Sequence, residues 1–176
     1  PSSYASSFVS SVKSGVKSFL SGGKSMPSQA TISDDDYDDL VERVLDNDPT
    51  LNELILDNKK EIGYDGGEAL WGALAHNEVV EQLSVRNSNI HDEEVEALSL
   101  ALVDNTSITH AWLGGNAITS EGADFLIGTL ESNDTILMLD LSGNKGIDPD
   151  IHDEIRDILE SRGSNYRSGI SEALSV

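Results

Sequence analysis

The sequence predicts an α/β fold: a short right-handed leucine-rich-repeat solenoid with about four parallel strands on its concave face and helices on its convex face. Two observations support this prediction. Residues Ile108 to Ile118 follow the pattern L-x-x-L-x-L-x-x-N-x-I, which is the leucine-rich repeat signature. Copies of the pattern begin at residues 51, 80, 108 and 136, in steps of 29, 28 and 28 residues. We therefore expect one repeat domain over residues 33–162.

Each repeat combines a short run of strand-forming residues with a longer segment of helical periodicity. The predicted strands are 53–57, 82–86, 110–114 and 138–142, and the predicted helices are 66–76, 92–104, 120–131 and 150–161. An Asn stands three residues before the second, third and fourth repeats, at positions 77, 105 and 133. A helix in every repeat is typical of the ribonuclease-inhibitor type, in which the wider helices curve the solenoid and leave a parallel sheet on the concave side.

A capping helix is predicted over residues 34–46, in front of the first repeat. Ser33 is suited to the N-cap, and Asp34, Asp35 and Asp36 place negative charge at the helix N-terminus, where the helix dipole favours it. The face that would cover the open end of the stack carries Leu40, Val41, Val44 and Leu45. The acidic run lacks the spacing of a calcium loop, so no metal site is predicted there.

Residues 1–32, which we call the arm, differ in composition from the rest of the chain. They are rich in Ser, their only charged residues are Lys13, Lys17 and Lys24, and a separate amphipathic helix is predicted within them. Its apolar side carries Tyr4, Phe8, Val9, Val12, Val16, Phe19 and Leu20. We expect this side, with Lys13 and Lys17, to dock on a membrane or on a partner protein; a targeting segment is the third alternative. Residues 163–176 are predicted to be a C-terminal tail.

Composition and charge exclude several classes of function. The chain has no cysteine, which disfavours a secreted, disulfide-bonded scaffold and predicts an intracellular protein, cytoplasmic or organellar or peripheral on a membrane. No run of apolar residues is long enough to span a bilayer. The formal charge is −21, and because the arm is +3 the remainder is −24. Such a chain has no basic stripe for a phosphate backbone, so nucleic acid is excluded as a partner.

The sequence contains no catalytic or metal-binding constellation, and neither an enzyme activity nor a cofactor is predicted. His76, His91, His110 and His152 stand in different repeats without the spacing of metal ligands. No G-x-S-x-G nucleophile motif occurs. The repeat residues Asn116 and Asn144 are predicted to be buried, with their amides bonded to turn backbone. Ser88 and Lys59 stand at the equivalent positions of the second and first repeats, where we expect looser turns.

The concave face is the candidate protein-binding site. Alternation along the strands directs one set of side chains outward, and one row across the sheet is predicted to contain Ile55, Ser84, Trp112 and Asp140. Trp112 and its neighbours have the composition of an interface hot spot. The candidate residues are Trp112, His110, Arg86, Met138, Ile55, Asp140, Ser84 and Gln82. The alternative is that the tail, through Ile170 and Leu174, folds back over Trp112.

Several motifs resemble a known family. The segment from Leu51 to Ile62, followed by a helix and Asn77, is similar to the opening repeat of the tropomodulin and leiomodin repeat domain. Asn105-Thr-Ser-Ile and Asn133-Asp-Thr-Ile resemble the helix-to-strand junctions of that family. The resemblance covers about residues 36–162 and implies a small actin-capping solenoid.

Three functions are consistent with these features. The favoured hypothesis is a non-enzymatic adaptor that binds a partner protein on its concave face and is tethered to a membrane or larger complex by the arm. The alternative is a tropomodulin-like, actin-associated cytoskeletal protein. It ranks second because the strongly negative repeat region disfavours approach to actin, which is itself acidic. The third is a structural subunit of a large assembly.

Overall fold

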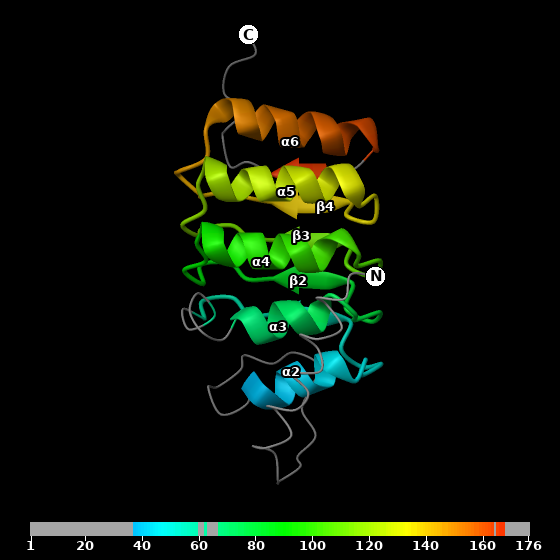
Figure 1. Cartoon of the computed structure of the whole chain (residues 1–176). Helices are drawn as coiled ribbons and strands as arrows, with labels where there is room; N and C mark the ends of the chain where they lie inside the picture. The colour runs from blue at the N-terminus through cyan, green and yellow to red at the C-terminus, as the bar shows by residue number, and fades with distance from the viewer. Residues whose placement is uncertain (1–36, 60–61, 63–66, 164, 168–176) are drawn as a thin grey trace.

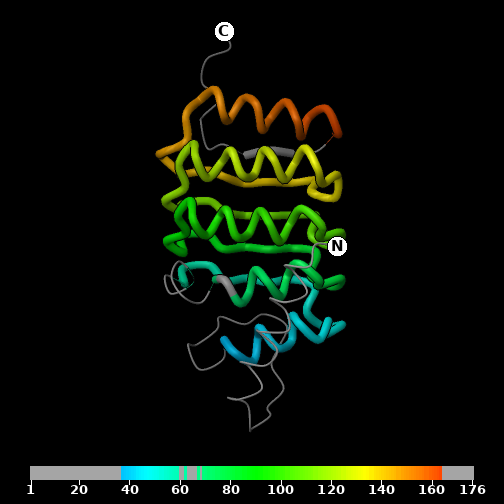
Figure 2. Tube along the Cα trace, viewed as in Figure 1, coloured from blue at the N-terminus to red at the C-terminus, as the bar shows by residue number. Residues whose placement is uncertain are grey.

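The chain forms a stack of strand-helix units, with the helices in one layer and the strands in a second (Figure 1). The computed structural model describes residues 37–59, 62, 67–163 and 165–167. The elements are α2 Tyr37–Leu45, β1 Glu53–Ile55, α3 Gly67–Leu74, β2 Gln82–Ser84, α4 Asp92–Val103, β3 His110–Trp112, α5 Ser120–Ser132, β4 Met138–Asp140, α6 Pro149–Ser161 and β5 Asn165–Arg167. Figure 2 shows the path of the chain coiling from the cap helix α2 to α6 at the opposite end.

The sheet is parallel throughout, in the order β1-β2-β3-β4-β5, which confirms the predicted solenoid. The register aligns Ile55 with Ser84, Ser84 with Trp112 and Trp112 with Asp140, as predicted. The first four strands begin at the predicted residues but span three residues each rather than five. Backbone pairing nevertheless continues beyond them, because the amide of Leu56 donates to the carbonyl of Ser84 over 2.7 Å.

A fifth strand corrects the interpretation of residues 163–176 as a tail alone. Residues Asn165–Arg167 form β5, which pairs with β4 and places Asn165 beside Met138. The sequence does not predict this strand, because three residues without the leucine spacing of the repeat have no recognisable periodicity. An extended segment can still join the sheet, since the exposed edge of β4 offers unpaired backbone groups.

The turn after each of the first four strands places a residue in the left-handed region, and the repeats supply this residue in two ways. Asn58 and Asn87 have φ angles of 64° and 53°, and Gly115 and Gly143 have φ angles of 72° and 77°. Glycine and asparagine are the residues that reach this region at least cost. These four positions follow the repeat period, so each of the first four strands ends in the same change of direction.

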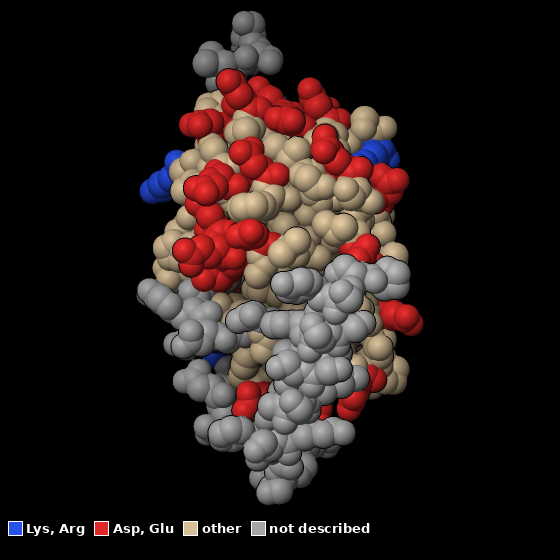
Figure 3. All heavy atoms as spheres, in the orientation of Figure 1, with Lys and Arg blue, Asp and Glu red and all other residues tan. Residues whose placement is uncertain are grey.

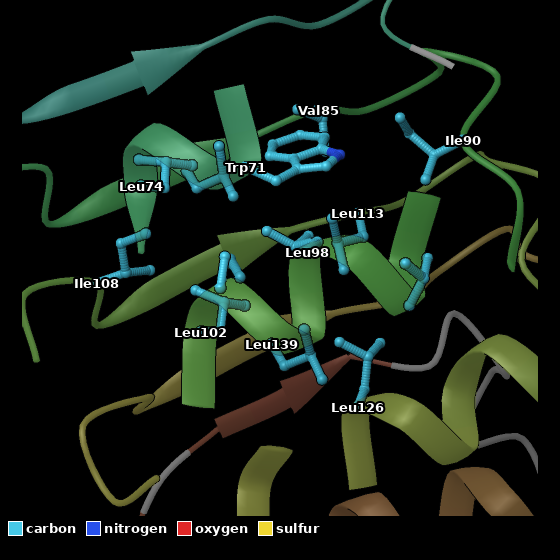
Figure 4. Packing of buried hydrophobic residues seen from close by; sticks show 14 of the residues in the cluster. Trp71, Leu74, Val85, Ile90, Leu98, Leu102, Ile108, Leu113, Leu126 and Leu139 are labelled. Atoms are coloured by element: carbon cyan, nitrogen blue, oxygen red, sulfur yellow. The ribbon is translucent and has the colours of Figure 1, made fainter. Parts of the chain in front are cut away.

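The core lies between the sheet and the helices (Figure 4). The central residue of each of the first four strands faces it and is almost completely buried: Leu54, Leu83, Ala111 and Leu139. Leu98, Leu102 and Leu126 pack against them from the helices. Trp71 of α3 is 2% exposed and belongs to the same cluster. Each buried leucine of this core contributes about 1.5–3 kcal/mol by burial.

The cap helix α2 covers the open end of this core. Leu40, Val41 and Val44 are buried in the common cluster and Leu45 packs against it, as predicted. The described part of this helix spans Tyr37–Leu45, and the predicted N-cap and first residues, 33–36, lie outside the described residues. The cap is therefore confirmed as an element, whereas its first turn is not described.

Buried asparagines at the helix ends connect successive repeats. The side-chain amide of Asn105 donates to the carbonyls of Leu74 and Asn77, over 2.8 and 3.1 Å, and its oxygen accepts from the amides of Ser107 and Ile108. Asn77 and Asn133 make the equivalent bonds one repeat away. In the last repeat the guanidinium of Arg162 takes over, donating to the carbonyls of Asn133 and Leu130.

A second set of buried amides holds the turns, as the sequence predicted. Asn116 donates to the carbonyls of Val85 and Leu113, each over 2.8 Å, and accepts from the amide of Ser88. Asn144 repeats this arrangement in the next turn. Ser88 partly replaces the missing asparagine in the second repeat, because its hydroxyl donates to the carbonyl of Leu56. These bonds satisfy turn backbone that the sheet leaves unpaired.

Some predictions fall on parts of the chain that the structure does not describe. The predicted amphipathic helix in residues 1–32 and the tail residues Ile170 and Leu174 lie outside the described residues, so both remain predictions. Within the described residues, no helix has the length and apolar character needed to cross a bilayer.

Candidate protein-binding face

The concave face carries a shallow groove over its first three strands. The groove has a volume of about 160 Å³ and is lined by Glu53, Ile55, Asp57, Gln82, Ser84, Arg86 and Trp112. Ile55 is 42% exposed, which is unusual for a large aliphatic side chain in this domain. Because strands β1 to β3 are in register, these side chains form adjacent rows, and the groove follows from strand alternation alone.

Trp112 is held in place by two neighbours on the same face. Its ring stacks on that of His110, with centroids 5.6 Å apart and planes inclined by 26°. The guanidinium carbon of Arg86 lies 5.4 Å from the centroid of the Trp112 ring, a cation-π distance. The imidazole Nδ1 of His110 is 2.8 Å from the hydroxyl of Thr109, which orients the imidazole. The indole is therefore half-buried and restricted before any partner arrives.

Arg86 is itself anchored by a buried carboxylate. Its Nη2 donates to Oδ2 of Asp140 over 3.1 Å, and Oδ1 of Asp140 accepts from the amide of Ser142. The side chain of Asp140 is 5% exposed, whereas that of Arg86 is 36% exposed. The pair therefore fixes Arg86 beside the indole while leaving part of the guanidinium open to a ligand. Charge-assisted bonds of this kind are stronger than neutral ones.

A second carboxylate fixes the opposite wall of the groove. Asp57 accepts the hydroxyl of Ser84 over 2.6 Å and the backbone amide of Arg86 over 2.8 Å. The side-chain amide of Gln82 donates to the carboxylate of Glu53 over 3.4 Å. Glu53 and Asp57 point outward by the predicted alternation, yet they were left out of the candidate site. Strand alternation was the signal that could have included them.

The structure brings the eight candidate residues together on one face, but it does not expose all of them. Met138, Asp140 and Ser84 are buried, with exposed fractions of 9%, 4% and 5%. These three side chains offer little contact area, but Ser84 and Asp140 hold their neighbours Asp57 and Arg86 by hydrogen bonds. The accessible part consists of Trp112, His110, Arg86, Ile55 and Gln82, with Glu53 and Asp57 at the margin.

The opposite, helical face is strongly acidic. Figure 3 shows Asp and Glu side chains gathered over one end of α4 and α5. A hollow of about 460 Å³ lies there, lined by His91, Asp92, Glu93, Glu94, Glu96, Glu121 and Phe125. Within the described residues, no group of three or more His, Cys, Asp or Glu is arranged to hold a metal ion. Asp92 has a structural role instead, because it accepts both the amide and the hydroxyl of Thr119 at the start of α5.

A family model described as the TMOD/LMOD leucine-rich domain matches residues 33–169. The chain belongs to this family. The match covers the cap helix and all four predicted repeats, and it extends through β5. The resemblance stated from the motifs at residues 51–62 and 77 is therefore confirmed.

Individual members of the tropomodulin and leiomodin family support the assignment. Leiomodin-1 of Homo sapiens is 30% identical over 103 residues, which are 58% of this chain and 17% of that protein. Leiomodin-1 of Rattus norvegicus is 29% identical over the same length. The chain thus spans only a small part of the full-length relatives that it matches.

Two solved structures have the same fold. A structure titled "Leiomodin-1 Actin-Binding Site 2 (ABS2)" superposes with a TM-score of 0.69 and 26% identity, covering 78% of this chain and 81% of that one. A tropomodulin C-terminal domain from Caenorhabditis elegans superposes with a TM-score of 0.68 and 20% identity, covering 79% and 84%. Both are leucine-rich-repeat solenoids of this family in their architecture.

These matches overturn the favoured functional hypothesis from the sequence. The membrane-tethered adaptor is wrong as the leading interpretation, because the family model and the leiomodin relatives support the tropomodulin-like alternative. The error came from weighing net charge above the repeat motifs. Net charge describes the long-range field of a whole domain, whereas an interface is decided by local complementarity.

Proposed function

We propose that the repeat domain binds actin. One observation carries this proposal: the solved structure that shares 26% identity and a TM-score of 0.69 with this chain is titled an actin-binding site of leiomodin-1. The likeness covers 78% of this chain, so it includes most of the repeat domain rather than a single motif. The domain would act by binding, without catalysis, and inside the cell, where actin filaments assemble.

We place the contact on the concave groove around Trp112. Trp and Arg are enriched among the residues that dominate binding energy, and this groove offers one of each beside an exposed aliphatic residue, Ile55. Trp112 and Arg86 are already fixed by His110 and Asp140, so binding would order few additional side chains. Preorganisation of this kind raises affinity by lowering the entropy lost on association.

The charge of the domain constrains how this contact works. With a net charge of −21, the chain repels an acidic protein at long range. Short-range apolar and aromatic contacts would then supply the affinity, and Arg86 would place a positive group at the centre of the face. Repulsion acts over the Debye length, about 10 Å at 0.1 M salt, so moderate salt should strengthen binding rather than weaken it.

Co-sedimentation of the full chain with actin filaments tests the proposal, together with a titration against actin monomers held unpolymerised. We expect binding to at least one form of actin. Trp112→Ala should reduce affinity by roughly thirtyfold, the effect of losing a central hot-spot residue worth about 2 kcal/mol. Leu100→Ala is the matched control, because Leu100 is also exposed and apolar but lies on α4 in the opposite layer.

The possible results test actin binding and the position of the binding face separately. No binding to either filaments or monomers at physiological salt would refute the proposed function. Binding that Trp112→Ala leaves unchanged, while Leu100→Ala weakens it, would keep actin as the partner and refute the concave contact.

A further inference from the structure

The outer surface of α4 exposes an apolar strip that is not buried in the core of the solenoid. Leu100 is 71% exposed and Val103 is 37% exposed, although Val95, Leu98 and Leu102 of the same helix are buried. Residues three apart lie side by side on a helix surface, so these two form a continuous patch. Ala97, one turn before Leu100, is partly buried and extends it.

The helices on either side leave room around this strip. The 28-residue step between Asn77, Asn105 and Asn133 places Gly72 of α3 and Gly128 of α5 at the positions equivalent to Leu100. Gly128 is exposed, and a Cβ added there would meet nothing within 4 Å. Leu100 therefore projects from the helical layer between two glycine positions on the neighbouring helices. Together with Val103 it forms a ridge along α4, and such a ridge can fit into a groove of another helix.

One edge of the strip is acidic. Glu93 and Glu96 precede Leu100 on α4, and Glu121 and Asp124 stand at the equivalent positions on α5. All four carboxylates are exposed, and none forms an ion pair within the described part of the chain. The hollow of about 460 Å³ between these helix ends is lined by three of them, together with Phe125. The surface therefore combines an apolar patch with an unpaired acidic border.

We propose that this surface, formed by Leu100, Val103, Phe125 and the four carboxylates, is the docking site for the chain's own N-terminal arm. Charge complementarity selects the occupant: residues 1–32 carry three lysines and no acid, whereas the rest of the chain has a charge of −24. The arm lies outside the described residues, and its sequence places Phe8, Val12, Val16 and Phe19 on one side of a helical wheel. Lys13 and Lys17 fall along one edge of that apolar side.

The dimensions permit this arrangement. Lys13 and Lys17 are about 6 Å apart along a helix, and packed helices such as α4 and α5 are roughly 8–10 Å apart, so the two lysines could face the two acidic helix ends. Residues 21–36 can reach at most about 58 Å when extended. The helices are packed in the order α2, α3 and α4, a separation of roughly 20 Å from the cap to the strip. Tethering also raises the effective concentration to the millimolar range, so a weak contact would be populated.

Carbodiimide cross-linking of the full chain, mapped by mass spectrometry, tests the proposal, because it joins only lysines and carboxylates in direct contact. We expect Lys13 and Lys17 to be joined to Glu93, Glu96, Glu121 or Asp124 within monomers. Leu100→Asp should lower the yield of these links about tenfold, the loss expected when an apolar anchor worth at least 1.4 kcal/mol is removed.

The control is Leu137→Asp. Leu137 is 45% exposed, lies just before β4, and acquires the same negative charge. If the arm is held by electrostatic attraction alone, the yield of cross-links should rise or stay constant in both variants. If it is held by apolar contact, the yield should fall only in Leu100→Asp. Three results would overturn the proposal: links spread evenly over the acidic surface, links found only in dimers, which would make a second copy the occupant, or a yield that Leu100→Asp does not lower.

Discussion

Replacing Asn105 by Ala should weaken the hydrogen bonding between two neighbouring repeats, and so destabilise the domain, without changing the apolar core. The side chain of Asn105 is 2% exposed and makes four hydrogen bonds to backbone. Two of them reach back to the carbonyls of Leu74 and Asn77 in the preceding repeat. The substitution removes all four bonds at once, and it leaves the buried amide of Ile108 without its acceptor.

The expected cost is about 4 kcal/mol. A typical intramolecular hydrogen bond contributes about 1 kcal/mol net, and four are lost. The unsatisfied Ile108 amide, which lies in a fully buried residue, raises the cost by about 1 kcal/mol or more. The amide of Ser107, which is only half-buried, can bond to water instead, and this lowers the cost by a similar amount. For a domain whose total stability is about 5–15 kcal/mol, this loss is large.

Equilibrium unfolding in urea measures this cost as a shift of the midpoint at constant slope. Asn52→Ala is the matched control, because the side chain of Asn52 is exposed, and we expect a change below about 0.5 kcal/mol there. A cost below about 1 kcal/mol for Asn105→Ala would show that the amide ladder does not couple the repeats. A change in the slope would instead indicate that the two-state assumption fails and that the repeats unfold separately.

Three further predictions concern the strand phase, the charge and the buried histidine. Leu113→Ala should cost roughly 2–5 kcal/mol, because Leu113 is fully buried, whereas Trp112→Ala should cost about 1 kcal/mol and keep the fold; the reverse order in urea unfolding would contradict the strand phase. The melting temperature should rise as salt increases from 0.01 to 0.1 M, because the Debye length falls from about 30 to about 10 Å and screens the net charge of −21; a flat or falling response would mean that the charges are already compensated. Burial depresses the pKa of His152 below its ordinary value of 6.5, with Arg156 nearby adding to the effect. The unfolded chain therefore binds more protons than the folded chain just below pH 6.5, and stability falls as pH decreases through that window. His152→Gln should remove this part of the pH dependence, measured as the difference between the two melting curves at pH 7 and pH 5.5; equal slopes for both proteins would refute it.

The elements were predictable because their signals are local. The repeat period and the alternation within each strand fixed which residues face inward, and Leu54, Leu83 and Leu139 are buried as expected. Strand lengths were overestimated by two residues each, although the amide of Leu56 still continues the backbone pairing beyond the three residues of β1. The Asn116 and Asn144 amides were also predictable, because a fixed position in a repeat implies a fixed partner in the preceding one.

The favoured function was wrong because the net charge of a chain does not describe how the charges are distributed over its surface. A net charge of −21 averages over the whole chain, and it does not show that the acidic side chains gather over α4 and α5 while the concave face centres on Trp112 and Arg86. The repeat motifs carried the correct information about family.

The sequence by itself determined the repeat, its phase and the family, because each depends on residues at fixed spacing along the chain. Tertiary structure decided which of the outward residues form a surface. Trp112 gains His110 and Arg86 as neighbours, and Arg86 gains Asp140 from two strands away, only because parallel pairing brings residues 54 positions apart within 3.1 Å. The same pairing recruits Asn165–Arg167 to the sheet and gives Arg162 the place of the repeat asparagine. Those contacts depend on the stacking of whole repeats, and no local pattern in the sequence specifies them.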